Sequence, residues 1–427
     1  MREMKDSGVV YIGNIPESWN VTRNKNVFSC SKDVVGSQFD NIQLLSLTTK
    51  GIKEKDINNA EGKLPESFDT YQVVKENDIV MCLFDLDMSA VFSGISHYNG
   101  MISPAYKVLT CKNGMLPKYA DYWFQYIFDN RKFSHYAKNI RYTLNYEDFS
   151  TLPIPQPPFE EQQRITNYLK KKCTKIDNII ASQQKIIEKF KAYKQSVITE
   201  TVMRGLIPDA EMKDSGIEFI GNFPSHWKIV RLKFLLTHLI DCPHETHKYD
   251  ADGKYLVIRT ADQDLAVLRK DEDMFRLSES EYENRIRRMS LDKDDIVYGR
   301  EGGRWGLACL VPESNKYCLG QRMLQFRCDR EVLNPQFAVY ALSSSTVYLQ
   351  GSFDTMGSAS PHVNISTVQN YAIAVPPIQE QEYIAKKLQK KCKDIDFAIE
   401  KRQRFIDKLI DYKKALIYEV VTGKRSV

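Results

Sequence analysis

Two long stretches of the chain carry apolar residues at the spacing of an α-helix. The first runs from Glu160 to about Gly205, with apolar residues at Ile165, Leu169, Ile176, Ile180, Ile187, Phe190 and Val197. The second runs from Gln379 to about Thr422, with apolar residues at Ile384, Leu388, Ile395, Ile399, Ile406, Leu409 and Leu416. Intervals of three, four and seven residues are typical of a helix that packs along one seam. We predict two long helices that pair as an antiparallel coiled coil; two independent amphipathic helices are the alternative.

These helices belong to an internal repeat. The segment Met4–Gly8 recurs 208 residues later as Met212–Gly216, and Ile15-Pro16 with Trp19 recurs as Phe223-Pro224 with Trp227. The start of the first helix, Pro157-Pro158 followed by Glu161-Gln162, recurs 219 residues later as Pro376-Pro377 followed by Glu380-Gln381. Between the repeated blocks the two halves are almost unlike in sequence. The chain is therefore a duplicated frame with two divergent inserts, and we predict an internal pseudo-two-fold repeat.

Each insert has the pattern of a mixed α/β domain. Short apolar runs bounded by polar and glycine-rich turns predict strands at Gln43–Leu47, Asp78–Leu83, Tyr255–Arg259 and Asp295–Tyr298. Helices are predicted at Lys118–Asn130 and Pro335–Leu342. The predicted fold class is therefore α/β, with two globular domains separated by the two long helices.

Composition limits the classes of protein that remain. The chain has 427 residues, of which 42% are hydrophobic and 27% are charged, which excludes wholesale disorder. No apolar run is long enough for a transmembrane helix, and the first ten residues have no secretory pattern, so we expect no membrane association. The 9 cysteines never form a CxxC pair, which favours reduced thiols and a cytoplasmic location. The net charge of +5 permits a polyanionic partner without requiring one.

The order of these features resembles the specificity (S) subunit of type I restriction-modification systems over nearly the whole chain. The resemblance rests on the two Pro-x-x-Trp segments, the two Pro-Pro-x-x-Glu-Gln helix starts, and phrases inside the inserts. Those phrases are Asn77–Val80, Ser103–Tyr106, Asp241–Thr246, Asp294–Val297, Leu319–Arg322 and Gly357–Ile365. Each motif alone is weak, but their duplicated order in one chain is specific. At Arg141–Asn145 the first insert departs from the glycine-rich phrase that the second insert keeps.

The resemblance implies a domain plan and a set of partners. The first target-recognition domain with its leading segment would occupy residues 1–156, and a central conserved helical region residues 157–211. The second leading segment and recognition domain would occupy residues 212–375, and a distal conserved helical region residues 376–427. Such subunits are not enzymes: they read a bipartite, asymmetric sequence on double-stranded DNA and dock two methyltransferase subunits and restriction subunits. S-adenosylmethionine and ATP would then be cofactors of the partner subunits, with none held by this chain.

Residues that could contact DNA lie in polar loops of both inserts. Base reading favours arginine or lysine for guanine and asparagine or glutamine for adenine, and phosphate contacts favour cationic and small polar groups. The candidates are Lys50, Lys53, Arg141, Tyr142, Asn145, His244, Thr246, His247, Lys248, Arg300, Arg304, Trp305 and Arg322. Ordinary loop polarity is the alternative for each, and internal pairing with a carboxylate is the alternative for Arg322.

Apolar residues of the repeated frame are candidates for contacts with partner subunits. These are Trp19, Trp227, Ile165, Leu169, Ile384 and Leu388. The alternative is that large apolar residues at these positions anchor the core of the chain itself.

Two kinds of chemistry have only incomplete motifs in the sequence. Cys242, His244 and His247 lack a fourth zinc ligand at standard spacing, so we predict no metal site. Gln156-Pro-Pro-Phe159 differs from an amino-methyltransferase motif in its first residue, and no glycine-rich methyl-donor loop follows a strand. A methyltransferase in its own right and a stand-alone, pseudo-dimeric DNA-binding or scaffold protein remain as rival functions.

Overall fold

A computed structural model describes residues 2–31, 33–37, 42–56, 67–86, 89–129, 143–243, 245–355 and 361–427. The chain forms two compact units. The first unit consists of Met1–Gln183 together with Arg404–Val427, and the second unit consists of Gln184–Gln403. These units cut across the four predicted divisions because each long helix contributes to both, and the divisions themselves stay a prediction.

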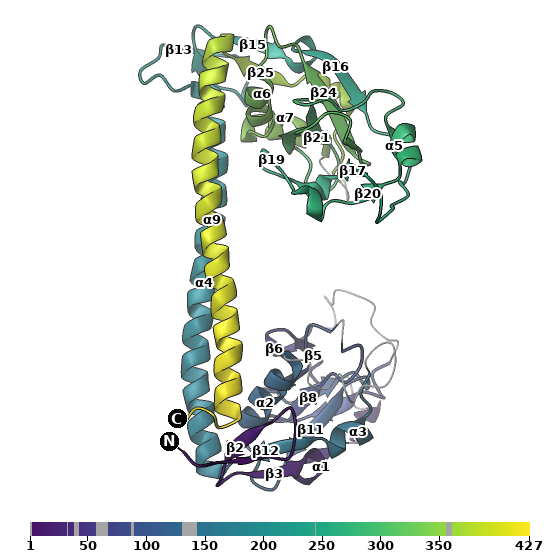
Figure 1. Ribbon diagram of the computed structural model, residues 1–427, viewed down its shortest axis with the longest axis vertical. Coiled ribbons are helices and arrows are strands. Elements are labelled where there is room, and N and C mark those ends of the chain that lie inside the picture. The colour runs from purple at the N-terminus through teal and green to yellow at the C-terminus, as the bar shows by residue number, and fades with distance from the viewer. Residues whose placement is uncertain are drawn as a thin grey trace. The chain divides into compact units, whose positions relative to one another are not determined.

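Both units are built on the same four-stranded antiparallel sheet (Figure 1). In the first unit its strands lie in the order β4 (Phe28–Cys30), β11 (Lys107–Cys111), β8 (Ile79–Met81) and β9 (Ser93–Ile95). In the second unit the order is β16 (Leu236–Asp241), β24 (Met323–Cys328), β21 (Ile296–Gly299) and β22 (Ala308–Leu310). The central strands β8 and β21 are buried throughout, which explains their unbroken apolar sequence. The two unlike inserts therefore share one framework.

The units differ in the strands added beside this sheet. The first has β5 (Leu45–Thr48) paired with β6 (Gly51–Glu54), and β7 (Gln72–Val74) paired with β10 (Gly100–Ile102). The second has β17 (Tyr255–Ile258) between β20 (Arg276–Leu277) and β23 (Tyr317–Leu319), with β17 and β23 parallel, and a hairpin of β18 (Gln263–Asp264) and β19 (Val267–Leu268). The predicted strands are confirmed at β8, β17 and β21, and the predicted run at 43–47 is shifted toward β5.

Short strands connect the inserts to the repeated frame. They form the pairs β1 (Met4–Asp6) with β2 (Asn14–Pro16), β3 (Asn20–Arg23) with β12 (Pro153–Gln156), β13 (Met212–Asp214) with β14 (Asn222–Pro224), and β15 (Lys228–Arg231) with β25 (Ala372–Val375). The shorter helices are α1 (Asn24–Val27), α2 (Pro117–Asp129), α3 (Tyr146–Thr151), α5 (Glu279–Arg285), α6 (Pro335–Leu342), α7 (Ser345–Thr355) and α8 (Ile365–Gln369). The helices predicted near 118–130 and at 335–342 are confirmed as α2 and α6.

The predicted long helices are α4 (Phe159–Arg204) and α9 (Ile378–Val421), and they pack in antiparallel directions (Figure 1). In the first unit, Ile165 and Leu169 near the start of α4 share a core with Leu416 and Val420 near the end of α9. In the second unit, the end of α4 shares a core with the start of α9, through residues that include Ile198, Val202, Ile384 and Leu388. The coiled-coil prediction is confirmed, and the alternative of independent helices is wrong.

One ion pair between the helices occurs in both units. Lys413 Nζ lies 2.7 Å from Asp177 Oδ1, and Lys194 Nζ lies 2.8 Å from Asp396 Oδ2. The repeat aligns Asp177 with Asp396 and Lys194 with Lys413, so both copies make the same contact. Lys194 is buried and also donates to the carbonyl of Leu265, 3.1 Å away, which links the helix pair to the β18–β19 turn.

Each unit contains a buried tryptophan that packs against the glycine beyond the end of a long helix. Trp19 Nε1 donates to Glu161 Oε2 at 2.9 Å, and the same carboxylate accepts from Arg2. In the second unit Trp227 lies against Gly205, which follows the last residue of α4. Gly423, just beyond α9, lies against Trp19 in the first unit in the same way.

The six apolar residues predicted to contact partner subunits are buried inside the chain. Trp19, Ile165, Leu169 and Ile384 have at most 1% of their surface exposed, and Trp227 and Leu388 have at most 2%. Side chains that fill the cores of the two units cannot also form an outer docking surface. The partner-contact prediction is therefore wrong for these residues, and the alternative that they anchor the core is correct.

We predict that alanine at position 423 destabilises the chain more than alanine at position 8. Both glycines have positive φ angles, 73° and 69°, so each substitution introduces left-handed backbone strain of about 1 kcal/mol. A Cβ at 423 would also lie 2.4 Å from Pro16, whereas a Cβ at 8 would meet nothing within 4 Å. We expect Gly423→Ala to lower the free energy of unfolding by roughly 2–4 kcal/mol and Gly8→Ala by about 1 kcal/mol in denaturant titrations. Equal losses would contradict the packing of Gly423 on Pro16.

Candidate DNA-recognition site

Three loop segments of the second unit meet at one edge of its sheet. They are the loop after β21 (300–305), the turn between β23 and β24 (320–322), and residues 361–363. The Arg300 amide donates to the Arg322 carbonyl at 3.0 Å, and the Val363 amide donates to the Arg300 carbonyl at 3.0 Å. A third backbone bond joins Gly302 to Pro361 at 2.9 Å. Backbone hydrogen bonds therefore fix these segments as one surface.

Arg300 is the internal support of this surface. Its side chain is 5% exposed, and its guanidinium lies 3.3 Å from carboxylate oxygens of both Asp241 and Glu301. Its Nη1 also lies 3.2 Å from His362 Nε2. Trp305 is buried as well and stacks on Tyr348 with ring centroids 4.2 Å apart. The prediction that Arg300 and Trp305 contact DNA is therefore wrong, because both side chains are buried and pack against residues of the same unit.

Two arginines of the same loops face solvent. The Arg322 side chain is 54% exposed, and its Nε lies 3.6 Å from Glu301 Oε2. The predicted alternative of a carboxylate partner for Arg322 is thus present, but the pair lies at the surface. Arg304 is exposed and donates to the Ala261 carbonyl at 3.3 Å. Contact of Arg304 and Arg322 with DNA stays a prediction.

The segment 245–249 lies beside these loops. The exposed Thr246 hydroxyl accepts from Gln321 Nε2 at 3.3 Å, so it adjoins the 320–322 turn. Lys248 is exposed, and its DNA contact stays a prediction. His244 lies outside the described residues.

The side chain of His247 is buried, which contradicts its predicted contact with DNA. It is 8% exposed, and its ring lies 5.2 Å from that of Tyr249. Burial lowers the pKa of His247 to about 4, and the Arg285 guanidinium acts in the same direction. Arg285 itself is buried and donates to the carbonyls of Glu245 and Leu319. A neutral, buried imidazole cannot supply a cationic contact to phosphate, so the prediction for His247 is wrong.

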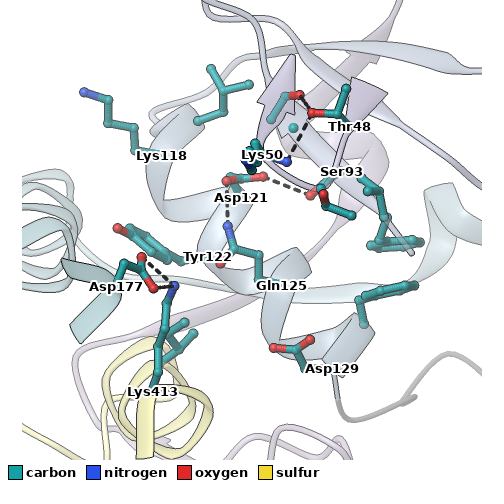
Figure 2. A pocket seen from close by; sticks show the side chains of 18 of the residues that line it. Thr48, Lys50, Ser93, Lys118, Asp121, Tyr122, Gln125, Asp129, Asp177 and Lys413 are labelled. Atoms are coloured by element: carbon teal, nitrogen blue, oxygen red, sulfur yellow. Dashed lines mark hydrogen bonds and ion pairs between the residues drawn. The ribbon is translucent and has the colours of Figure 1, made fainter. Parts of the chain in front are cut away.

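In the first unit, the β5–β6 hairpin carries the predicted lysines. Lys50 and Lys53 are exposed, and Lys50 lines a cavity of about 660 Å³ (Figure 2). Four further lysines line the same cavity: Lys118, Lys170, Lys413 and Lys414. The site therefore presents several cations to a polyanion, and DNA contact by Lys50 and Lys53 stays a prediction.

An acidic group lies among these lysines. Asp121 of α2 accepts from Ser93 and from Gln125, each at 2.9 Å (Figure 2). Burial raises the pKa of Asp121, although both hydrogen bonds act in the opposite direction. The Asp177–Lys413 pair lines the cavity too, so Lys413 is already partly neutralised.

The remaining candidates of the first insert divide into two groups. Asn145 caps α3, because its side chain accepts from the Asp148 amide at 2.7 Å. Capping explains an asparagine at this position, and a DNA contact by its exposed side chain stays a prediction. Arg141 and Tyr142 lie outside the described residues.

The sequence did not predict the side-chain contacts around Glu301. Glu301 pairs with Arg322 and with His362, and Gln321, which precedes Arg322, donates to Thr246. Their signal was present, because Leu319–Arg322 and Gly357–Ile365 stood out as phrases, but the sequence does not show that the two phrases meet. Across the described ranges, no three His, Cys, Asp or Glu side chains are grouped to hold a metal ion. Among the described residues, no helix is long and apolar enough to cross a membrane.

The fold and its loops define a class of protein in which two α/β modules present different polar surfaces from one frame of paired helices. Residues 224–404 match the family model for the type I restriction modification DNA specificity domain. The chain is therefore similar to the specificity subunits of type I restriction-modification systems.

Known relatives of the chain match it along most of its length. The type I restriction enzyme MjaX specificity subunit of Methanocaldococcus jannaschii is 22% identical, over 97% of this chain and 95% of the relative. The MjaVIII specificity subunit of the same organism is 24% identical, over 82% and 80%. A solved chain from work on complex assembly and conformational transition of the type I R-M system aligns with a TM-score of 0.66. That alignment covers 96% of this chain and 99% of the solved one at 15% identity, which shows the shared fold.

We predict that His247 makes the chain acid-sensitive. Unfolded histidine titrates near pH 6.5, whereas folded His247 titrates at about 4, so the unfolded state takes up the proton first. Stability contributed by the neutral ring is therefore lost as the pH falls from about 6.5 toward 4. We expect His247→Gln to lose less stability than the wild type between pH 7.5 and pH 5, measured as the shift of the thermal unfolding midpoint. Identical shifts in both proteins would show that His247 does not titrate in this way.

Proposed function

We propose that each unit of this specificity subunit reads one half of a bipartite, asymmetric DNA target. The observation that carries the proposal is that both units contain a four-stranded sheet of the same strand order, with different loops attached to it. The sheets β4–β11–β8–β9 and β16–β24–β21–β22 have the same strand order, while the added strands and exposed loops differ. A shared framework with different reading surfaces suits two unlike half-sites in one target.

The electrostatics of the exposed loops support DNA as the ligand. Lys50 and Lys53 in the first unit, and Lys248, Arg304 and Arg322 in the second, are exposed cations on loops or on a strand next to a loop. Such groups neutralise phosphates and release counterions, which favours association at low salt. The net charge of only +5 indicates local patches rather than a uniformly basic surface.

We further propose that the chain itself is not catalytic and works with enzyme partners. Two methyltransferase subunits would dock on the paired helices, and restriction subunits would join that core. Exposed aromatic side chains along the helices, among them Tyr193, Tyr383, Phe397 and Phe405, are better suited to docking than the buried residues of the seam. S-adenosylmethionine and ATP would be bound by those partners, and the complex would act in the cytoplasm.

The test is sequencing-based mapping of methylated adenines in cells that make this chain with and without its methyltransferase partner. We expect a split motif with a fixed gap only when both proteins are present. Methylation by this chain alone would favour the rival of an independent methyltransferase. No methylation in either case, with DNA binding intact, would favour a stand-alone scaffold or DNA-binding protein.

A further inference from the structure

We propose that Arg322 and Glu301 together read one G·C base pair in the half-site of the second unit. The inference rests on the proposed function and assigns a base to one pair of side chains. The Arg322 guanidinium would donate to O6 and N7 of the guanine, and the Glu301 carboxylate would accept from N4 of the cytosine. These are the contacts that base-pair geometry in the major groove favours for arginine and for glutamate.

The backbone at Arg322 is the first observation. Its φ angle is 69°, in the left-handed region that a side chain with a Cβ disfavours. The strain is held by neighbours, since the Arg322 carbonyl accepts from the Arg300 amide and Gly320 is packed against the Ile258 carbonyl. A glycine would adopt the same turn without strain, so the conformation alone does not explain an arginine. The exposed guanidinium that it carries gives a reason.

The setting of the guanidinium is the second observation. Arg322 Nη1 lies 3.7 Å from the point that a Cβ on Gly302 would occupy, so it passes over a residue with no side chain. Glu301 Oε2 lies 3.6 Å from Nε, on one edge of the fork. Within the described part of the chain, Glu301 is the one carboxylate that pairs with Arg322. The guanidinium is thus held near an acidic neighbour, on a side chain that is 54% exposed.

Glu301 has more side-chain partners than Arg322, and its negative charge favours a base rather than a phosphate as the ligand of this surface. Its Oε1 lies 3.3 Å from Arg300 Nη2 and 3.0 Å from His362 Nδ1, and its side chain is 21% exposed. A carboxylate held at this surface would be repelled by a DNA phosphate, but it can accept from the amino group of cytosine. An adjacent donor fork and acceptor are complementary to the two edges of a G·C pair. Arg300 is then a positioning residue, which acts through Glu301.

The experiment maps adenine methylation in cells that make the chain with its methyltransferase partner. The variants are Arg322→Gly, which suits the positive φ angle, Arg322→Lys, and Glu301→Gln. Arg330→Ala is the matched control, because Arg330 is also exposed and pairs with one carboxylate, Asp294, at 3.2 Å, beyond the other end of β24. Methylation at the first half-site reports that each variant folds and assembles.

We expect the wild-type motif to contain an invariant G·C pair in the second half-site. Arg322→Gly should lower discrimination at that position by roughly 5- to 100-fold and leave the other positions unchanged. Glu301→Gln should relax the same position, Arg322→Lys should be intermediate, and Arg330→Ala should match the wild type.

Three results would overturn the inference. The second half-site would lack an invariant G·C pair, or Arg322→Gly would keep the full motif, or methylation would fall equally at all sites with the motif unchanged. The last result would identify a phosphate contact instead. Each of these leaves a split motif in the wild type, whereas failure of the proposed function would remove the split motif altogether.

Discussion

The antiparallel packing of α4 against α9 is the contact on which both units depend. Each unit is completed by one end of α4 and the opposite end of α9, so neither helix end can leave without exposing a core. The ion pairs Lys413–Asp177 and Lys194–Asp396 repeat within this seam and fix the register of the two helices. One copy of the repeat supplies the aspartate of each ion pair and the other copy the lysine, so each copy provides the partner that the other needs.

The loops can differ between the two units because buried side chains within each unit stabilise them. In the second unit a buried Arg300 joins Asp241, Glu301 and His362, so the cost of burying one charge is offset by several partners. The exposed side chains of the same loops, such as Arg322, are then available for recognition. Arg300 is buried and stabilises the loops, whereas Arg322 is exposed on the same surface. The two arginines therefore have different structural roles although they lie in neighbouring loops.

The sequence predicted the frame well and the site only in part. Periodicity at positions such as Ile165 and Ile384 defines a helix seam, and the repeat requires that both seams have a partner in the same chain. For Trp19 the sequence left core anchoring and partner contact both open. Burial of Arg300 could not be predicted, because a residue in a polar loop has no periodic signal and its environment depends on distant segments. The convergence of Arg322 and His362 on Glu301 is likewise a product of the tertiary fold, although both residues lie in phrases that stand out in the sequence.

The most direct test of two independent reading units is a chain that carries the first insert twice, with residues 20–156 also replacing residues 228–375. Its methylated motif should become symmetric, with the first half-site on both sides of the gap and the second half-site lost. Retention of the original asymmetric motif would contradict the central claim that each insert specifies its own half of the target.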